Sequence, residues 1–230
     1  MHLLRRSILL SLALPVALAA QRRAPAPKQP IDWPALEREG LTLLRDYLRV
    51  NTTNPPGNEL EAARLLRDFL ARQGIDAQLL DTAELGAGRA NLYARVKGNG
   101  GKRAIALVHH LDVVPATANT WAVPPFSGTL RDGYVYGRGA LDMKSEGIAH
   151  IMAVVALKRG GVPLTRDLVI IANADEELGS TGAVTFVDRH ADLLRDVEVS
   201  SPRAAATRCG TIRFASAASV SRRSEPSGSG

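Results

Sequence analysis

The sequence predicts an α/β fold in which a layered mixed or mostly parallel sheet is flanked by helices. Three observations predict it. The chain has 230 residues, 45% of them hydrophobic, which is enough to bury one good core. The run "DLVIIANA" is almost continuously apolar, as in strands that are buried on both faces. Helical patterns alternate with β-type runs along the chain, and this alternation is typical of α/β layers.

The first two expected elements are amphipathic helices. Asp32 can cap the first helix, and Pro34 lies in its first turn, where its missing N–H is not needed. The second helix runs from about Glu59 to Gly74, a residue suited to the left-handed conformation that ends helices. The turn residues of "NTTNPPGNE" separate the two helices.

The remaining elements alternate between strands and helices. Three short β-type runs come first: "IDAQLL", "NLYARVK" and "AIALVHH". Asp132 and Gly133 form a favoured tight-turn pair inside "TLRDGYVYG", which predicts a hairpin. Apolar residues at helical spacing predict a helix from Met143 to about Lys158, and a last helix is expected over residues 180–194.

The N-terminal segment indicates export. Residues 1–19 read as a cleaved secretory signal peptide, because two arginines precede an apolar stretch too short for an ordinary membrane span. Ala17 and Ala19 stand where a signal peptidase cleaves. A retained membrane anchor is the alternative. Residues 20–31 read as a Pro-rich linker, and the mature chain is expected to be secreted or periplasmic without a stable membrane span.

The composition changes after Glu198. Residues 32–198 have the composition of a folded domain, whereas residues 199–230 contain eight serines and neither leucine nor lysine. One interpretation is a disordered tail. The other is GC-rich coding DNA read out of frame, since such reading yields mostly Ala, Arg, Ser, Pro and Gly. The complete absence of leucine favours the second interpretation.

The charge distribution argues against binding to nucleic acid or membranes, and the cysteine content excludes an intrachain disulfide. The net charge of +6 comes from the ends of the chain, because the 199–230 tail holds five arginines against one acid and the signal segment holds two more. The domain between them is nearly neutral, so no basic face for nucleic acid or membrane is expected. Cys209 is the only cysteine, which excludes an intrachain disulfide.

The stretch "HHLDVVP" carries the first candidate site residues. Side chains two apart on an extended strand share a face, so His110 and Asp112 project together beyond the "AIALV" strand while His109 faces away. This is the geometry of a metal-binding imidazole and the carboxylate that orients it. A solvated strand end is the alternative interpretation.

Two further acidic positions point to the same chemistry. Asp142 precedes a predicted helix, where it could also serve as a plain N-cap. Asp175, Glu176 and Glu177 follow the most buried strand, and adjacent carboxylates repel one another unless cations compensate them. An acidic turn is the alternative. Together these residues fit a binuclear metal site with a bridging carboxylate, single ligands and one acid left to accept a proton.

Three motifs in order strengthen this hypothesis. "HLDVVP", "PPFSGTLRDGYVYGRGALDMKS" and "ADEELGS" resemble the zinc-dependent aminoacylase and carboxypeptidase family, which includes aminoacylase, acetylornithine deacetylase, succinyl-diaminopimelate desuccinylase and glutamate carboxypeptidase. "YLRVNTTNPPGNE" fits the same family. The resemblance covers about residues 32–198, the N-terminal part of a catalytic domain. It implies two zinc ions, a small peptide or N-acyl amino acid as substrate, and hydrolysis of an amide bond.

The resemblance also implies roles for individual residues. His110 would bind one zinc ion, Asp142 would bridge both ions, and Glu177 would bind the other. Glu176 would be the general base for the attacking water, and Asp112 would orient His110. A serine-hydrolase mechanism is not expected, because the sequence has no G-x-S-x-G motif.

The sequence departs from the family pattern beyond these motifs. The family supplies a further carboxylate ligand after the Glu177 position, then a lid domain with dimer contacts, and then a last histidine ligand. The place of that carboxylate reads "VSSPRAA" here. The expectation is therefore a domain truncated before the lid, with each zinc ion one protein ligand short. An inactive fragment that at most binds metal weakly is the alternative to an active hydrolase.

Overall fold

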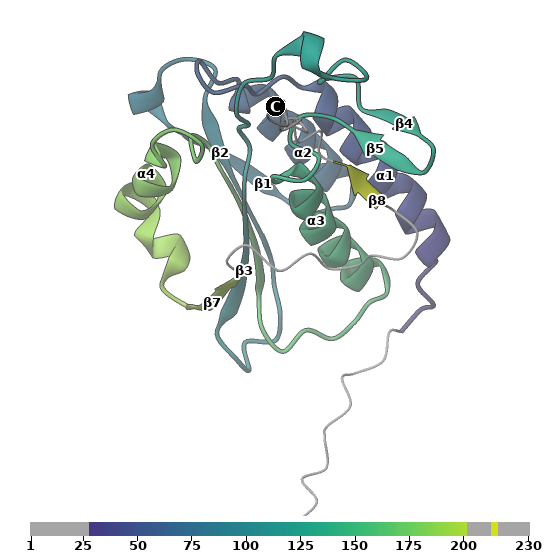
Figure 1. The fold of residues 1–230 in the computed structure, drawn as a ribbon. Coiled ribbons are helices and arrows are strands. Elements are labelled where there is room, and N and C mark those ends of the chain that lie inside the picture. Colours follow the sequence, from purple (N-terminus) through teal and green to yellow (C-terminus); the bar gives the residue numbers. More distant parts are fainter. Residues whose placement is uncertain (1–27, 202–212, 216–230) are drawn as a thin grey trace, which may run out of the picture.

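The computed structural model describes residues 28–201 and 213–215 (Figure 1). The predicted signal peptide and most of the predicted linker and tail lie outside these residues. Strand β7, Val197–Ser201, crosses the position after Glu198 at which the sequence composition changes. The domain boundaries themselves stay predictions.

A five-stranded mixed sheet forms the centre of the fold, in the order β1-β2-β6-β3-β7. The strands are β1 (Ala77–Asp81), β2 (Ala90–Val96), β3 (Ala104–His110), β6 (Leu168–Asn173) and β7. β1, β2 and β6 are antiparallel neighbours, whereas β6, β3 and β7 run parallel. The predicted fold class is confirmed, and the apolar run "DLVIIANA" provides the central strand.

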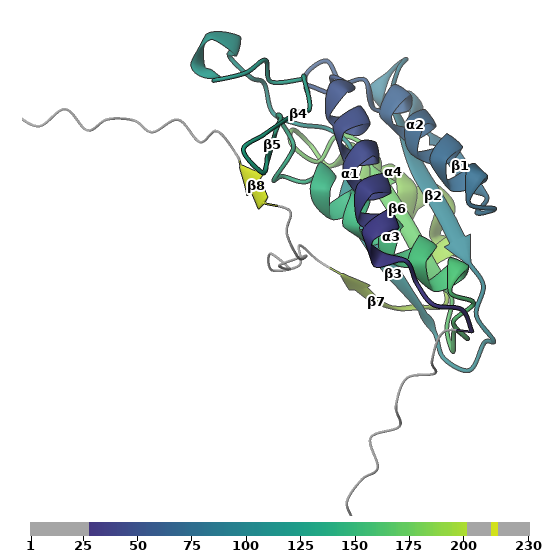
Figure 2. The same ribbon diagram turned by 90° about the vertical axis from the view of Figure 1, so that its right-hand side faces the viewer.

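Helices cover both faces of this sheet (Figures 1 and 2). The first three, α1 (Trp33–Arg49), α2 (Glu59–Arg72) and α3 (Lys144–Arg159), lie on one face. α4 (Thr181–His190) lies on the other and continues as the 3₁₀ helix η3 (Ala191–Leu194), so the last predicted helix is in fact two elements. No helix in the described part of the chain combines the length and apolar character that a membrane crossing needs.

The main core lies between the sheet and helices α1 to α3. Asp32 caps α1 as predicted, because its carboxylate accepts a hydrogen bond from the Ala35 amide at 2.9 Å. α1 is amphipathic as predicted, and its buried face contains Leu36, Leu43, Leu44 and Leu48. Each buried leucine contributes about 1.5–3 kcal/mol relative to an exposed one, so this face fixes α1 against its neighbours.

A hairpin extends the domain beside the C-terminal end of α1. β4 (Thr129–Arg131) and β5 (Tyr134–Tyr136) pair antiparallel, and β8 (Arg213–Ala215) runs parallel to β5 (Figure 2). Both turn residues have positive φ, 53° at Asp132 and 77° at Gly133, as the Asp-Gly pair predicts for a tight hairpin.

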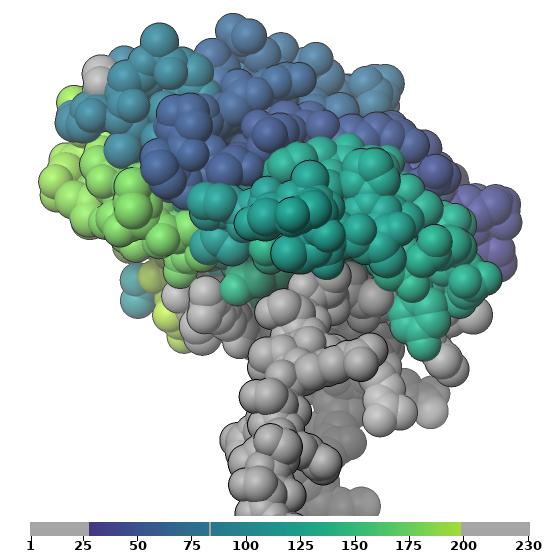
Figure 3. Space-filling model, turned by 45° about the horizontal axis from the view of Figure 1, so that its top comes forward, coloured from purple at the N-terminus to yellow at the C-terminus, as the bar shows by residue number. Residues whose placement is uncertain are grey.

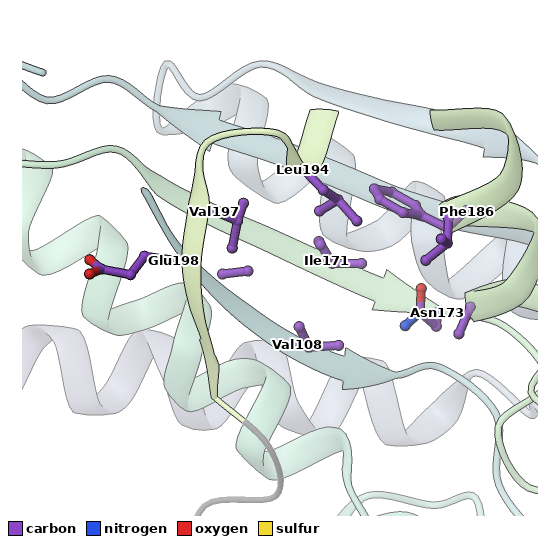
Figure 4. A pocket seen from close by; sticks show the side chains of 10 residues that line it. Val108, Ile171, Asn173, Phe186, Leu194, Val197 and Glu198 are labelled. Atoms are coloured by element: carbon purple, nitrogen blue, oxygen red, sulfur yellow. The ribbon is translucent and has the colours of Figure 1, made fainter. Parts of the chain in front are cut away.

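The α4 face of the sheet carries an open cavity of about 370 Å³ (Figure 4). Its lining is mostly apolar and includes Val108, Ile171, Phe186 and Leu194. None of the predicted site residues lines this cavity, which therefore lies apart from the candidate chemistry.

An ionic cluster ties the start of β6 to β2 and the loop after it. The Asp167 carboxylate contacts Arg95 Nη1 and Lys97 Nζ, each at 3.0 Å, and accepts a hydrogen bond from the Gly98 amide at 2.8 Å. Burial raises the pKa of Asp167, but the Gly98 amide and the two cations outweigh burial, so its pKa lies below the ordinary 3.8.

Asp167→Asn should lower the free energy of unfolding at pH 7 by about 1–3 kcal/mol, since it removes a carboxylate bound to charged donors. A lowered folded-state pKa stabilises the fold above the unfolded pKa, and this contribution disappears as the pH falls below 3.8. Urea unfolding at pH 7 and pH 3 should therefore show the difference between wild type and variant shrinking in acid. A difference that stays constant or grows would contradict the assignment.

Candidate metal centre

The parallel pairing of β3 and β6 brings the predicted site residues together. His110, the last residue of β3, is in register with Asn173, the last residue of β6, and the Leu111 amide donates to the Asn173 carbonyl at 2.8 Å. Loops that follow parallel neighbours leave the sheet at the same edge. The segment containing Asp112 and the acidic run 175–177 therefore lie side by side.

Three predicted ligands converge at this edge. His110, Asp142 and Glu177 each offer one ligand atom, and these atoms lie within 4.8 Å of one another. His110 Nε2 is 3.2 Å from Asp142 Oδ1. His110 is buried while the Asp142 side chain is 54% exposed, so the cluster opens to solvent on one side. Figure 3 shows a face on which segments from the early (blue), middle (teal) and late (green) parts of the domain adjoin.

The backbone of Asp112 sets the orientation of the His110 ring. His110 Nδ1 lies 2.9 Å from the Asp112 carbonyl oxygen and 3.5 Å from the carboxylate Oδ1. A carbonyl only accepts, so Nδ1 carries the proton and Nε2 is directed toward Asp142 with its lone pair in the neutral ring. Burial lowers the pKa of His110, but Asp112 and Glu176 outweigh burial and raise the pKa to about 9.

The carboxylate of Asp112 holds the acidic loop. Its Oδ1 accepts from the Glu176 amide and its Oδ2 from the Glu177 amide, both at 3.0 Å. Asp112 is completely buried. Burial raises its pKa, but hydrogen bonds from His110, Asn54 and these two amides outweigh burial and keep the pKa low. Asp112 thus contacts the His110 ring and also fixes the backbone of Glu176 and Glu177.

Glu176 and Glu177 both face other charged groups at the site. Glu176 Oε2 is 3.8 Å from His110 Nε2, and the Glu176 side chain is 39% exposed. Burial, together with Asp142, Asp112 and Glu176, raises the pKa of Glu177, although His110 opposes this. A divalent cation would relieve the repulsion among these carboxylates, and an imidazole with carboxylates is a donor set that zinc uses.

Comparison with known proteins identifies the family. Residues 106–217 match the profile of Peptidase family M20/M25/M40. A probable succinyl-diaminopimelate desuccinylase of Staphylococcus epidermidis is 31% identical over 153 residues, covering 66% of this chain and 36% of that protein. Residues 106–217 belong to peptidase family M20. The family predicted from the three motifs is thereby confirmed, and the chain is an enzyme by family.

Solved structures of the M20 family share this fold. Human carnosine dipeptidase 1 superposes with a TM-score of 0.64 at 24% identity, over 73% of this chain and 38% of that one. An M20 metallo-carboxypeptidase of Sulfolobus solfataricus gives a TM-score of 0.62 at 26% identity, over 70% of this chain and 36% of that one. The chain thus spans little more than a third of the length of these relatives.

Asp142 does not cap helix α3. Helix α3 starts at Lys144, and its N-cap is Met143, which makes no side-chain capping bond. The N-cap interpretation of Asp142 is therefore wrong. The carboxylate instead approaches His110 Nε2.

The acidic run divides into one structural acid and two site acids. For Asp175 the compensating cation is a protein side chain, Arg89. Asp175 Oδ1 lies 3.3 Å from Arg89 Nη2 and accepts from Asn54 Nδ2 at 2.8 Å. Its φ of 64° turns the backbone so that Glu176 and Glu177 continue toward His110.

Several buried polar residues around the candidate site were missed from the sequence. Glu59 and Arg89 form a buried ion pair under the acidic loop. Lys144 is fully buried, and its Nζ donates to the Tyr47 and Val50 carbonyls, at 3.0 and 2.8 Å, where α1 ends. Burial lowers the pKa of Lys144 to about 7. In the sequence, Arg89 is only a lone arginine before β2 and Glu59 only a glutamate after "NPPGN". Neither pattern shows that the two residues pair.

His109 lies against α3, apart from the ligand cluster. It is buried, and a Cβ on Gly147 would lie only 2.4 Å from its ring, so the glycine makes room for the imidazole. Burial lowers the pKa of His109 to about 3 and keeps the ring neutral. This placement agrees with the expectation from the sequence that His109 faces away from His110.

Proposed function

We propose that the chain hydrolyses an amide bond in a small peptide or N-acyl amino acid by using metal-activated water. The observation that carries the proposal is the convergence of His110, Asp142 and Glu177 with Glu176 beside them. The M20 relatives support it, since one is named a desuccinylase and another a metallo-carboxypeptidase. Because the chain spans 36% of the desuccinylase, the activity of the whole protein belongs to the proposal as well.

The donor set fits zinc. His110 would bind one ion through Nε2, Glu177 would bind a second, and Asp142 would bridge the two. Bound zinc lowers the pKa of a water molecule from 15.7 to about 7 and polarises a carbonyl. Zinc identity and the presence of two ions are parts of the proposal, supported by the mixed nitrogen and oxygen donors.

Asp112 and Glu176 have the remaining roles in the proposed reaction. Asp112 keeps the Nδ1 proton of His110 in place and leaves Nε2 available. Glu176 lies near the ligand cluster with a partly exposed carboxylate, where it would take a proton from the attacking water. The same carboxyl group would then deliver that proton to the leaving amine.

Metal removal tests the proposal directly. We expect the purified chain to bind zinc, and a chelator should abolish hydrolysis of N-acyl amino acids or dipeptides. Metal content by mass spectrometry and amine release measure the two effects. Activity that is unaffected by chelation would contradict the proposal, whereas zinc binding without turnover would favour the alternative of a weakly metal-binding, inactive fragment.

Export through residues 1–19 is a separate proposal. It is supported by the apolar stretch after two arginines and by the small residues before position 20. N-terminal sequencing of the chain recovered outside the cytoplasm should begin near residue 20. Recovery of the intact N-terminus would favour the membrane-anchor alternative.

A further inference from the structure

The segment that contains Asn54 is fixed beside the end of β3. Thr52 Oγ1 donates to the Leu111 carbonyl at 2.7 Å, and the Val113 amide donates to the Thr52 carbonyl at 3.1 Å. The Asn54 amide donates to the Val113 carbonyl at 2.9 Å. Residues 52–54 thus run alongside residues 111–113, and this pairing fixes the backbone of Asn54.

The Asn54 side chain connects two buried carboxylates beside the candidate site. Its Nδ2 lies 2.8 Å from Asp112 Oδ2 and 2.8 Å from Asp175 Oδ1. A primary amide has two N–H groups, so both bonds form at once. Asn54 is only 3% exposed, and its Oδ1 has no hydrogen-bond partner among the described residues. A buried acceptor without a partner is costly, which indicates that asparagine is used here for its two donors.

The two carboxylates lie in the two different segments that carry His110 and the candidate glutamates. Asp112 follows β3 and contacts the His110 ring, whereas Asp175 follows β6 and begins the loop that carries Glu176 and Glu177. Without a donor between them, two buried carboxylates repel each other. We propose that Asn54 is a positioning residue. Its two N–H groups hold the acidic loop against Asp112 and so keep the Glu176 and Glu177 side chains close to His110.

Amide hydrogen exchange in the metal-free full-length chain tests the positioning itself. The Glu176 and Glu177 amides donate to Asp112, so they should exchange about tenfold faster or more in Asn54→Ala, which removes two charge-assisted donors. Asn54→Ser, with one hydroxyl donor, should give a smaller acceleration. This readout is independent of metal binding, and unchanged exchange of both amides in Asn54→Ala would overturn the inference.

Zinc titration tests the consequence, and this readout rests on the proposed function. The zinc dissociation constant of Asn54→Ala, measured by competition with a chromophoric chelator, should rise about 10–100-fold, as for lost outer-sphere support of metal ligands. Unchanged affinity would overturn the predicted consequence for the metal. If the wild-type chain binds no zinc, the proposed function fails, and the exchange experiment still decides the role of Asn54.

Asn91 provides the matched control. It is also buried and makes two hydrogen bonds beside the same loop, to the Ala174 amide and the Gly182 carbonyl, both at 2.8 Å. In the described structure Asn91 makes no hydrogen bond to Asp112 or Asp175, so Asn91→Ala should speed exchange at Ala174 while leaving Glu176 and Glu177 within about twofold of wild type. If Asn54→Ala and Asn91→Ala accelerate exchange at the two glutamates equally, either substitution merely destabilises the loop, and the inference is overturned.

Discussion

Glu176→Gln is expected to lower kcat by about 10²–10⁴-fold, the contribution typical of a positioned general base. Glutamine has almost the same shape as glutamate but cannot take a proton from water. The Glu176 amide would still donate to Asp112, so the loop should keep its conformation. Zinc content and the free energy of unfolding should therefore stay close to the wild-type values, and steady-state kinetics with N-acyl amino acids or dipeptides measure the loss.

Glu146→Gln is the matched control for this substitution. Glu146 is a partly buried acid on α3, and its carboxylate lies 3.8 Å from His150 rather than at the ligand cluster. Its substitution should leave kcat unchanged. If Glu176→Gln retains wild-type turnover, the proton acceptor is a different group and the proposed mechanism is wrong. If it loses zinc together with activity, Glu176 acts as a ligand instead of a base.

The fold and the convergence of the site could be predicted because both depend on local patterns. Helical spacing, apolar runs and the Asp-Gly turn each act over a few residues. His110 and the acids after β6 could be placed together because each follows a strand, and the ends of parallel strands meet at one edge of the sheet. Asp142 required the motif resemblance, since its own surroundings favoured a helix cap.

The support beneath the site could not be predicted, because it is built from side chains that are far apart in sequence. Asn54 and Asp175 are 121 residues apart and Arg89 and Asp175 are 86 apart, yet both pairs are in contact. Nothing in the acidic run itself distinguishes Asp175, which Arg89 compensates, from its two neighbours. The burial of Lys144 could not be predicted either, because it depends on how α3 packs against the end of α1.

Arg89→Ala is expected to be the most destabilising of the substitutions considered, by about 3–5 kcal/mol at neutral pH, because it leaves buried charge without its partner. Arg89 bonds to Glu59, which is completely buried, and to Asp175, which is 4% exposed. A Cβ on Gly57 would overlap the guanidinium, so Arg89 fits tightly against that backbone. Urea unfolding followed by tryptophan fluorescence measures the loss. Arg67→Ala is the control, since its ion pair with Asp68 is exposed and should contribute less than about 1 kcal/mol.

The pH dependence separates lost charge compensation from lost packing in Arg89→Ala. Burial raises the pKa of Glu59 even in the wild type, although the hydrogen bond from Arg89 opposes it, and removing Arg89 should raise that pKa further. A group whose folded-state pKa is raised stabilises the fold at low pH and loses this contribution as the pH rises. The deficit of Arg89→Ala should therefore shrink as the pH falls and Glu59 takes up a proton. A deficit that is the same at pH 7 and pH 5 would mean that Arg89 stabilises the site by filling space rather than by its charge.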